Sequence, residues 1–378
     1  MLPAPKPDGL SLADVLESCL ASISGEPSRL GLARVDRAVV LLVDGLGAQA
    51  LTDRIGHART LAAAFTPKAV IESGFPSTTA AAIASLTTGV RPGQHGIVGY
   101  SVLDPAHDRV VNQLSGWDDR IDPFAWQPIP TIFQRAERAG LLAVAIGPER
   151  YRESGFSAAV LRGARYVAAA SIADRMARAA EFLAEPGPPG LAYVYVPELD
   201  SAAHAHGTES REWTNALETT DAAARDLVAA LGKRHGLIVT ADHGLLDIPQ
   251  HGHIRFDESP ALVDGVRFVA GEPRCLQLHF EPDASASVRD RTVEAWRAAE
   301  SGRSWVATRD EAVAADWFGP VRAGVGERIG DLLVAARKNV AYYDSRAGTH
   351  GTSMIGQHGS WSPAETRVPV LRYGAFAG

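Results

Sequence analysis

The chain has 378 residues, 46% apolar and 21% charged, which suits one large α/β domain or a core domain with a sizeable insertion. A formal net charge of −7 argues against proteins that coat nucleic acid or lie on a membrane surface, so we expect neither a nucleic-acid polymer nor a membrane as partner. The N-terminal residues interleave acids, no stretch is apolar enough to span a membrane, and the two cysteines (Cys19, Cys275) lie far apart, so we expect a reduced, cytoplasmic protein.

Helical and extended patterns alternate along the first 250 residues. They predict helices at 11–23, 57–66, 79–88, 131–140, 171–184 and 209–231, and strands at 38–43, 68–73, 141–147, 191–196 and 236–241. Apolar strands that alternate with helices are typical of a parallel sheet covered on both faces. We therefore predict an α/β fold with a mostly parallel central sheet, whose core comprises residues 1–250 and 346–378.

The stretch 251–345 has a different pattern. Short strands such as CLQLHF and DLLVAA surround one clear helix, SVRDRTVEAWRAAE. We predict that this stretch forms a smaller α+β insertion, a cap over the main sheet. The sequence leaves open whether the cap moves as a lid or stands as a rigid wall.

The strand signal AVVLLV at 38–43 ends in Asp44. Open α/β sheets bind their ligands at the carboxyl ends of parallel strands, so this carboxylate lies where a ligand is expected. Taken alone, Asp44 is equally compatible with a helix cap.

Further acidic and histidine side chains follow the carboxyl ends of other strands, and one histidine lies in a glycine-rich segment near the C-terminus. These residues are Asp200, His204, Asp242, His243 and His358. Each by itself is more often an ordinary polar residue, but with Asp44 they place three aspartates and three histidines at one sheet edge. Mixed carboxylate–imidazole sets suit zinc, manganese or iron, so the sequence predicts two divalent metal ions as cofactors.

Three hydroxyl residues, Ser77, Thr78 and Thr79, stand at the start of the expected helix at 79–88. A helix N-terminus exposes unpaired N–H groups that bind phosphate, although a Ser or Thr at this position most often only caps the helix. Beside two metal ions, one of these hydroxyls could instead be a nucleophile activated by a metal.

Taken together, these segments resemble the alkaline phosphatase superfamily and, within it, the type I phosphodiesterase/nucleotide pyrophosphatase family. The resemblance covers about 40–250 and 345–375 and is carried by VLLVDGLG, FPSTTAAAIASLTTGVRPGQHGIVGY, VYVPELDSAAHAHG, IVTADHG and GQHGSWSPAE. It implies an alkaline phosphatase-like three-layer sandwich and a metal-dependent hydrolase.

The resemblance also implies roles for individual residues. One metal ion would be held by Asp200, His204 and His358, and the other by Asp44, Asp242 and His243. The nucleophile would be Thr79, which would contact a metal ion and form a phosphothreonine-type intermediate by in-line transfer. The metal ions would align Thr79 on phosphorus and stabilise the leaving oxygen.

At one position the chain departs from the family. Family members carry a phosphate-binding asparagine shortly after the His-Gly-Ile-Val element, where this chain has Tyr100. Either the Tyr100 hydroxyl or another residue such as Asn112 would take over that contact. The aromatic residues considered for stacking on a base are Tyr100, Trp117, Phe124, Trp126 and Tyr151, each of which is more often ordinary packing.

The resemblance implies hydrolysis of nucleotide phosphodiester bonds, with Mn²⁺ or Zn²⁺ as cofactor. The length and the SWSPAETRVPVL segment are similar to actinobacterial members that cleave cyclic di-AMP, with pApA and AMP as products. Alternatives left open are a phosphonoacetate hydrolase-like enzyme, a phosphomonoesterase or phosphomutase, and a nucleotide sensor without turnover. A dinucleotide-dependent oxidoreductase is disfavoured, because DGLG after the first strand is not a G-x-G-x-x-G fingerprint.

Overall fold

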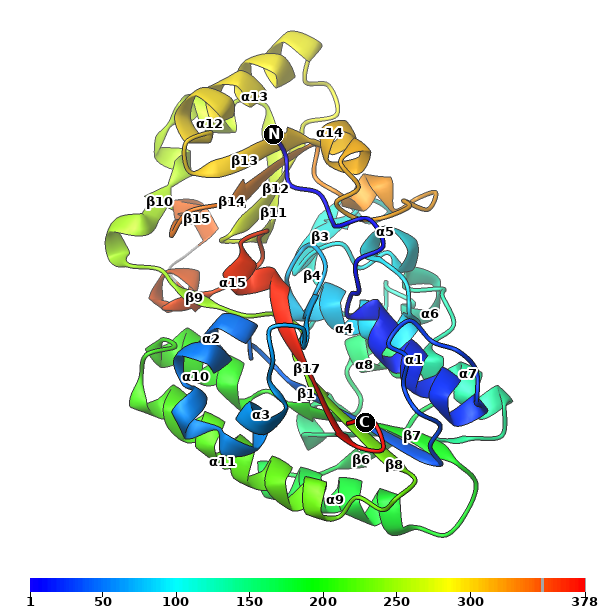
Figure 1. Ribbon diagram of the computed structural model, residues 1–378. Coiled ribbons are helices and arrows are strands. Elements are labelled where there is room, and N and C mark those ends of the chain that lie inside the picture. Colours follow the sequence, from blue (N-terminus) through cyan, green and yellow to red (C-terminus); the bar gives the residue numbers. More distant parts are fainter. Residues whose placement is uncertain (348–349, 378) are drawn as a thin grey trace.

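A seven-stranded sheet forms the centre of the computed structural model, which describes residues 1–347 and 350–377 (Figure 1). Its strand order is β2 (Val70–Glu72), β17 (Arg367–Gly374), β8 (His235–Thr240), β1 (Arg37–Val43), β7 (Gly190–Val196), β5 (Leu142–Gly147) and β6 (Arg165–Ala168). The strands from β8 to β6 run parallel, and β17 is antiparallel to both of its neighbours. The mostly parallel sheet expected from the sequence is confirmed.

The register of the three central strands positions the functional edge of the sheet. All residues of β1 are buried, as expected for its unbroken apolar run. Val43 at the end of β1 pairs with Val196 at the end of β7, and Leu42 pairs with Thr240 at the end of β8. The residues that follow these strands therefore emerge at the same level.

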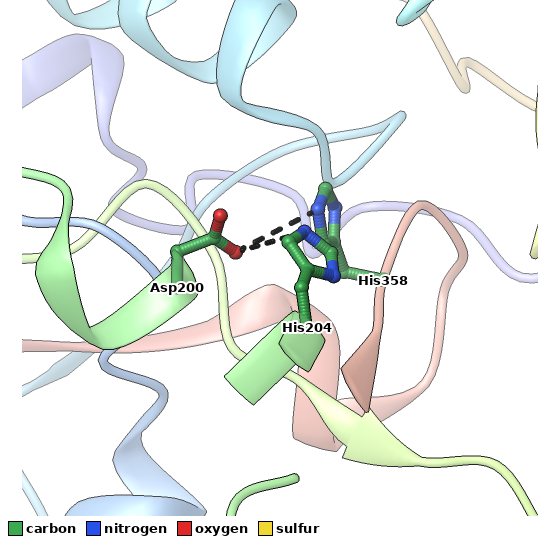
Figure 2. A group of neighbouring side chains, drawn as sticks. All are labelled: Asp200, His204 and His358. Carbon is green, nitrogen blue, oxygen red and sulfur yellow. Dashed lines mark ion pairs between the residues drawn. The ribbon is translucent and has the colours of Figure 1, made fainter. Parts of the chain in front are cut away.

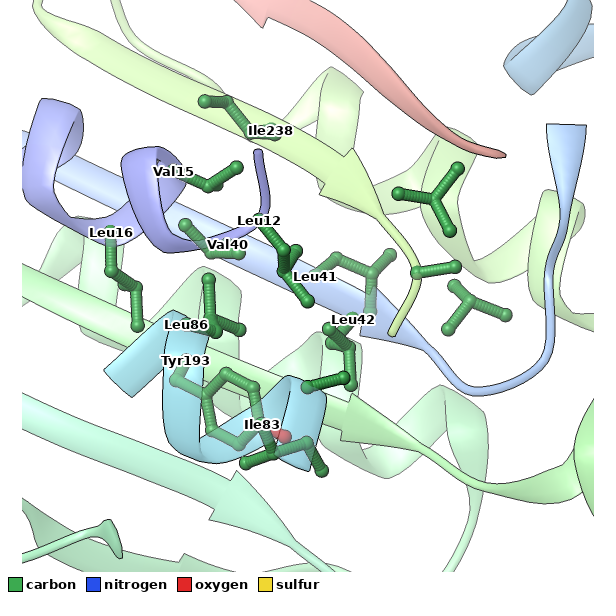
Figure 3. Close-up of a cluster of buried hydrophobic side chains, with 14 of the residues drawn as sticks. Leu12, Val15, Leu16, Val40, Leu41, Leu42, Ile83, Leu86, Tyr193 and Ile238 are labelled. Atoms are coloured by element: carbon green, nitrogen blue, oxygen red, sulfur yellow. The ribbon is translucent and has the colours of Figure 1, made fainter. Parts of the chain in front are cut away.

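Helices cover both faces of the sheet (Figure 1). One face carries α1 (Ala13–Ser24), α4 (Thr79–Thr88), α7 (Ile132–Arg138) and α8 (Gly155–Val160); the other carries α2 (Ala48–Asp53), α3 (Arg59–Ala64), α9 (Ile172–Ala184), α10 (Glu198–His206) and α11 (Arg211–Ala229). In Figure 3, Val15 of α1 and Leu86 of α4 lie against Val40 of β1 in one continuous core. Burying each such side chain contributes about 1.5–3 kcal/mol.

The helix α4 is buried along its whole length, which its alanine-rich sequence permits. Besides packing against α1, this helix contacts His95, in the short helix α5 (Pro92–His95). The His95 Nδ1 accepts a hydrogen bond from the Ile97 N–H at 3.1 Å, so the ring donates through Nε2 to the Ser85 hydroxyl of α4 at 3.0 Å. A buried neutral imidazole thus holds this helix in place.

A second, four-stranded antiparallel sheet lies above the first (Figure 1). Its order is β11 (Val266–Glu272), β12 (Cys275–Phe280), β14 (Leu332–Ala336) and β13 (Ser304–Thr308), and α13 (Ala286–Glu300) packs on it. One face of this sheet joins the main core through side chains such as Leu333, whereas the other buries Leu278 and Trp296 in a separate cluster. The boundaries at 250/251 and 345/346 stay a prediction.

Polar contacts also fix the second sheet to the main core. Arg274, in the turn between β11 and β12, makes a fully buried two-bond ion pair with Glu365, at 2.8 and 2.7 Å. Arg328 donates to the carbonyl oxygens of Gly96 and Trp126 at 2.9 and 3.0 Å. A shared apolar core with buried charged contacts favours a fixed wall over a hinged lid.

The remaining helices and strands are short. They are β3 (Ser101–Asp104), β4 (Arg109–Asn112), α6 (Pro123–Trp126), β9 (Leu246–Asp247), β10 (His253–Arg255), α12 (Pro260–Val263), α14 (Arg309–Ala314), β15 (Ala341–Tyr343), β16 (Gly356–Gln357) and α15 (Pro363–Thr366). The helix predicted at 57–66 begins later, at Arg59, and ends at Ala64, since Phe65 is already extended and Pro67 follows.

The pH dependence of stability should report on the buried His95. Burial lowers its pKa to about 3, from an ordinary value near 6.5. The unfolded chain binds the proton of this histidine more readily than the folded protein does. The contribution of His95 to the free energy of unfolding is therefore complete above about pH 6.5 and is lost as the pH falls toward 3, by up to about 1.4 kcal/mol per pH unit. We expect His95→Gln to be less stable than wild type at pH 7 and to lose less stability on acidification. Parallel denaturation curves for the two proteins across this range would contradict this assignment.

Candidate active site

The carboxyl ends of β1, β7 and β8 bring the predicted site residues together. Asp44 directly follows β1, and Asp242 and His243 follow β8. Asp200 and His204 lie one turn apart on α10, which begins just after β7. His358 comes from the distant C-terminal segment, directly after β16.

One group of ligands comprises Asp200, His204 and His358, shown in Figure 2. The Asp200 Oδ1 lies 3.2 Å from the His204 Nε2 and 4.0 Å from the His358 Nε2. Both Nδ1 atoms donate to carbonyl oxygens, His204 to Gly356 at 2.7 Å and His358 to Ser77 at 2.9 Å. Because Nδ1 carries the proton in each ring, each Nε2 offers its lone pair toward Asp200, as a metal ligand requires.

The second group, Asp44, Asp242 and His243, is almost completely buried. The His243 Nε2 lies 3.4 Å from the Asp44 Oδ1 and 3.6 Å from the Asp242 Oδ2. The outer oxygens have protein donors, because the Tyr195 hydroxyl donates to the Asp44 Oδ2 and the Gly45 N–H donates to the Asp242 Oδ1 at 3.1 Å. The inner oxygens of both carboxylates converge on His243.

Divalent cations fit these two groups on electrostatic grounds. Among the described residues, the Asp44 Oδ1, Asp200 Oδ1 and Asp242 Oδ2 have no hydrogen-bond partner although they are buried. Burial, together with the negative charges of Asp242 and Asp200, raises the pKa of Asp44, and burial raises the pKa of Asp200. Burial and the neighbouring histidines lower the pKa of His358, which keeps it neutral. Unpaired buried carboxylates beside imidazole nitrogens are costly without a cation, and this donor set suits Zn²⁺ or Mn²⁺.

Of the three candidate hydroxyls, Thr79 is the one in contact with a residue of these groups. Its Oγ1 lies 3.1 Å from the His243 Nε2. Ser77 is used structurally, because its Oγ donates to the Ser360 carbonyl at 2.7 Å and accepts from the Gly359 N–H at 3.2 Å. Thr78 stands at the N-cap of α4, yet its side chain makes no capping hydrogen bond within the described structure.

A cavity of about 90 Å³ adjoins Thr79 and is mainly aromatic and aliphatic. Its aromatic lining consists of Tyr151, Phe156, Tyr166, Tyr193 and Tyr195. The ring centroids of Tyr151 and Tyr195 are 5.8 Å apart, in an edge-to-face arrangement. Tyr195 therefore both lines this cavity and holds a carboxylate of the second ligand group.

The sequence did not single out Phe156, Tyr166, Tyr193 or Tyr195. For Tyr193 and Tyr195, the alternation in LAYVYV could have indicated such a role. Two tyrosines that lie two residues apart in a buried strand share one face of the sheet, and their hydroxyls need hydrogen-bond partners.

The residues proposed to contact substrate lie in different surroundings. Tyr151 is the one of the five aromatic candidates that lines the cavity. Trp117 and Trp126 pack edge to face on each other, and Phe124 is 58% exposed.

Tyr100 and Asn112 are absent from the cavity lining. Tyr100 is 38% exposed. The Asn112 Oδ1 accepts from the N–H groups of Leu114 and Ser115, at 2.8 and 3.0 Å, so this atom holds a turn. Their roles in substrate binding stay predictions.

Comparison with known proteins identifies the family. The model of the family described as type I phosphodiesterase / nucleotide pyrophosphatase matches residues 38–361. The chain belongs to this family. An uncharacterized pyrophosphatase/phosphodiesterase of Schizosaccharomyces pombe is 28% identical over 181 residues, which cover 45% of this chain and 36% of that protein. The chain thus matches little more than a third of the length of this relative.

Two solved structures have the same fold. Murine ectonucleotide pyrophosphatase / phosphodiesterase 5 aligns with a TM-score of 0.67 at 17% identity, covering 89% of this chain and 88% of the other. Phosphonoacetate hydrolase from Sinorhizobium meliloti 1021 aligns with a TM-score of 0.67 at 18% identity, covering 89% of each chain. At these identities the likeness shows the fold, which confirms the predicted alkaline phosphatase-like α/β class. Among the described residues, no helix is both long and apolar enough to cross a membrane.

Replacing Asp242 should separate metal binding from folding. We expect Asp242→Asn to lose one of two tightly bound Mn²⁺ ions and to lower turnover by at least about 100-fold. The metal-free variant should be no less stable than metal-free wild type, because one of three clustered negative charges is removed.

The measurements are metal content by mass spectrometry and thermal unfolding in chelator. Asp226→Asn, which changes an exposed carboxylate, is the control. Two tightly bound ions in Asp242→Asn would contradict the assignment of this residue as a ligand.

Proposed function

We propose that this protein is a two-metal phosphodiesterase that cleaves nucleotide phosphodiester bonds with Thr79 as nucleophile. The observation that carries the proposal is the position of the Thr79 Oγ1, at the start of α4, 3.1 Å from the His243 Nε2 and at the edge of an aromatic cavity. One ion would be held by Asp44, Asp242 and His243, and the other by Asp200, His204 and His358. When bound, these ions would lower the pKa of the Thr79 hydroxyl and offset negative charge on the phosphoryl oxygens.

The chain's own groups account for the remaining steps. The Thr79 Oγ1 attacks phosphorus, loses its proton to solvent and forms an Oγ1–P bond while the bond to the leaving oxygen breaks. The leaving oxygen takes up a proton, and water then cleaves the Oγ1–P bond and restores the Thr79 hydroxyl. The free N–H groups in the first turn of α4, where Thr79 lies, would stabilise the charge on the phosphoryl oxygens.

The cavity supports a nucleotide as the substrate. Tyrosine and phenylalanine rings bind bases by stacking, at about 1–3 kcal/mol per base. A murine ectonucleotide pyrophosphatase / phosphodiesterase 5 of the same fold has been solved as an inactive variant in complex with AMP. We propose cyclic di-AMP as the substrate, with pApA and then AMP as products, on the sequence resemblance given above.

The same cavity argues against a phosphonoacetate hydrolase. Phosphonoacetate carries a carboxylate beside its phosphonate, which calls for a cationic partner. None of the described residues that line the cavity is charged at neutral pH. A flat aromatic base suits this lining better than a second anionic group.

Substrate identity should be decided by a panel with Mn²⁺ or Zn²⁺. We expect cyclic di-AMP to yield pApA and pApA to yield AMP. ATP, bis(p-nitrophenyl) phosphate and p-nitrophenyl phosphate should be hydrolysed more slowly, and phosphonoacetate should not be hydrolysed. Chromatography of the products is the measurement. Turnover of the monoester or the phosphonate alone would overturn the proposal, and tight nucleotide binding with no turnover would indicate a sensor.

The nucleophile should be detectable as a covalent adduct. In Thr79→Ala we expect turnover to fall by at least about 1,000-fold, whereas Thr79→Ser keeps a hydroxyl and part of the activity. With a cyclic substrate the leaving oxygen stays tethered, so the adduct on Thr79 carries the whole dinucleotide. Rapid quenching and intact-mass measurement would reveal it. The same adduct on Thr79→Ala would exclude Thr79 as the nucleophile.

A further inference from the structure

Glu272, the last residue of β11, projects from the second sheet to the metal-ligand groups of the main sheet. It is 7% exposed, and its Oε2 lies 3.5 Å from the His358 Nδ1. Its Oε1 is buried without a hydrogen-bond partner among the described residues. The mechanism proposed above gives this carboxyl group no part, although it reaches the ring of a proposed ligand.

The backbone around His358 is shaped to admit Glu272. Gly359 adopts a φ of +129°, and a Cβ at this position would lie 2.5 Å from the Cγ and Cδ of Glu272. A residue with a side chain would therefore clash with Glu272 as well as strain the backbone. The His-Gly pair thus allows the carboxyl group to approach the imidazole closely.

The neighbouring cation, Arg274, is already engaged elsewhere. Arg274, two residues beyond Glu272, directs its Nε and one terminal nitrogen at Glu365. Its other terminal nitrogen donates to the carbonyl oxygens of Lys338 and Val340, both at 2.8 Å. Within the described part of the chain, Glu272 therefore faces His358 without an arginine or lysine partner, while the Arg274–Glu365 pair holds its strand in place.

We propose that Glu272 is a positioning residue for the metal site of Asp200, His204 and His358, an inference that rests on the proposed two-metal function. The His358 Nδ1–H donates to the Ser77 carbonyl at 2.9 Å, and Glu272 adds a carboxylate on the side of the ring opposite the metal-binding Nε2. A carboxylate at this position orients the imidazole and makes it a stronger ligand, and loss of such partners lowers metal affinity by about 10- to 100-fold. The second sheet thereby helps to build the metal centre.

The other ligand group has its own outer partner from a different part of the chain. The Tyr195 hydroxyl of β7 donates to Asp44, and Glu272 of β11 faces His358. Because the two partners act on different groups, loss of Glu272 should weaken one metal ion and leave the other unchanged. A general disturbance of the fold would weaken both.

The experiment measures Mn²⁺ affinity, by calorimetry and by the electron paramagnetic resonance signal of bound Mn²⁺, in chelator-treated protein. Asp242→Asn isolates the Asp200, His204 and His358 site, and His204→Ala isolates the other. We expect Glu272→Gln to weaken Mn²⁺ binding by about 10- to 100-fold in the Asp242→Asn background and to change it less than about twofold in the His204→Ala background. Glu272→Asp, which keeps the charge, should restore part of the affinity.

The matched control is Glu300→Gln, because Glu300 is also a buried carboxylate of the second sheet region but is paired with Arg303 and Tyr342. It should lower the unfolding temperature without changing Mn²⁺ affinity. Equal weakening of both sites by Glu272→Gln, or a change in unfolding temperature alone, would overturn the proposal.

If wild type binds two Mn²⁺ ions but turns over no member of the substrate panel, the proposed function is refuted. The role of Glu272 would then still be decided by the Mn²⁺ affinities of its variants. Failure of wild type to bind Mn²⁺ or Zn²⁺ would refute both.

Discussion

Three buried carboxylates held at the ends of three adjacent parallel strands impose the main constraint on this structure. Asp44, Asp200 and Asp242 lie at one sheet edge because β1, β7 and β8 are paired so that they end at the same level. Their inner oxygens lack protein partners among the described residues, and burial together with neighbouring negative charge raises the pKa of Asp44. Such an arrangement is stable only when the packing of the surrounding core holds the carboxylates in place despite their repulsion, or when bound cations neutralise their charge.

Hydrogen bonds from several segments of the chain hold the candidate ligands in place. Each histidine of the first group is oriented by a backbone carbonyl, and each carboxylate of the second group has a donor on its outer oxygen. Ser77 links the segment that carries Thr79 to the loop that carries His358. Displacement of one loop would therefore displace the other, so the segments that carry Thr79 and His358 are positioned as one unit.

The second sheet is part of this unit. Its inner face belongs to the same apolar core as the main sheet, and the buried pair of Arg274 and Glu365 joins it to the C-terminal segment. Removing one partner of such a pair typically costs about 3–5 kcal/mol, because the other charge is left buried and uncompensated. These contacts favour a fixed wall beside the site over a hinged lid, and they bring Glu272 to His358.

The sequence by itself determined the fold class, the family and the six candidate ligands. Long apolar strands with polar residues at their carboxyl ends are local signals, and parallel pairing places such ends on one edge whatever the strand order. The tertiary structure decided which residues meet across the chain. Glu272 approaches His358 only because β11 docks on the core, and Tyr195 reaches Asp44 only because β1 and β7 are neighbours in register. Contacts of this kind depend on packing between segments far apart in sequence, which local patterns do not encode.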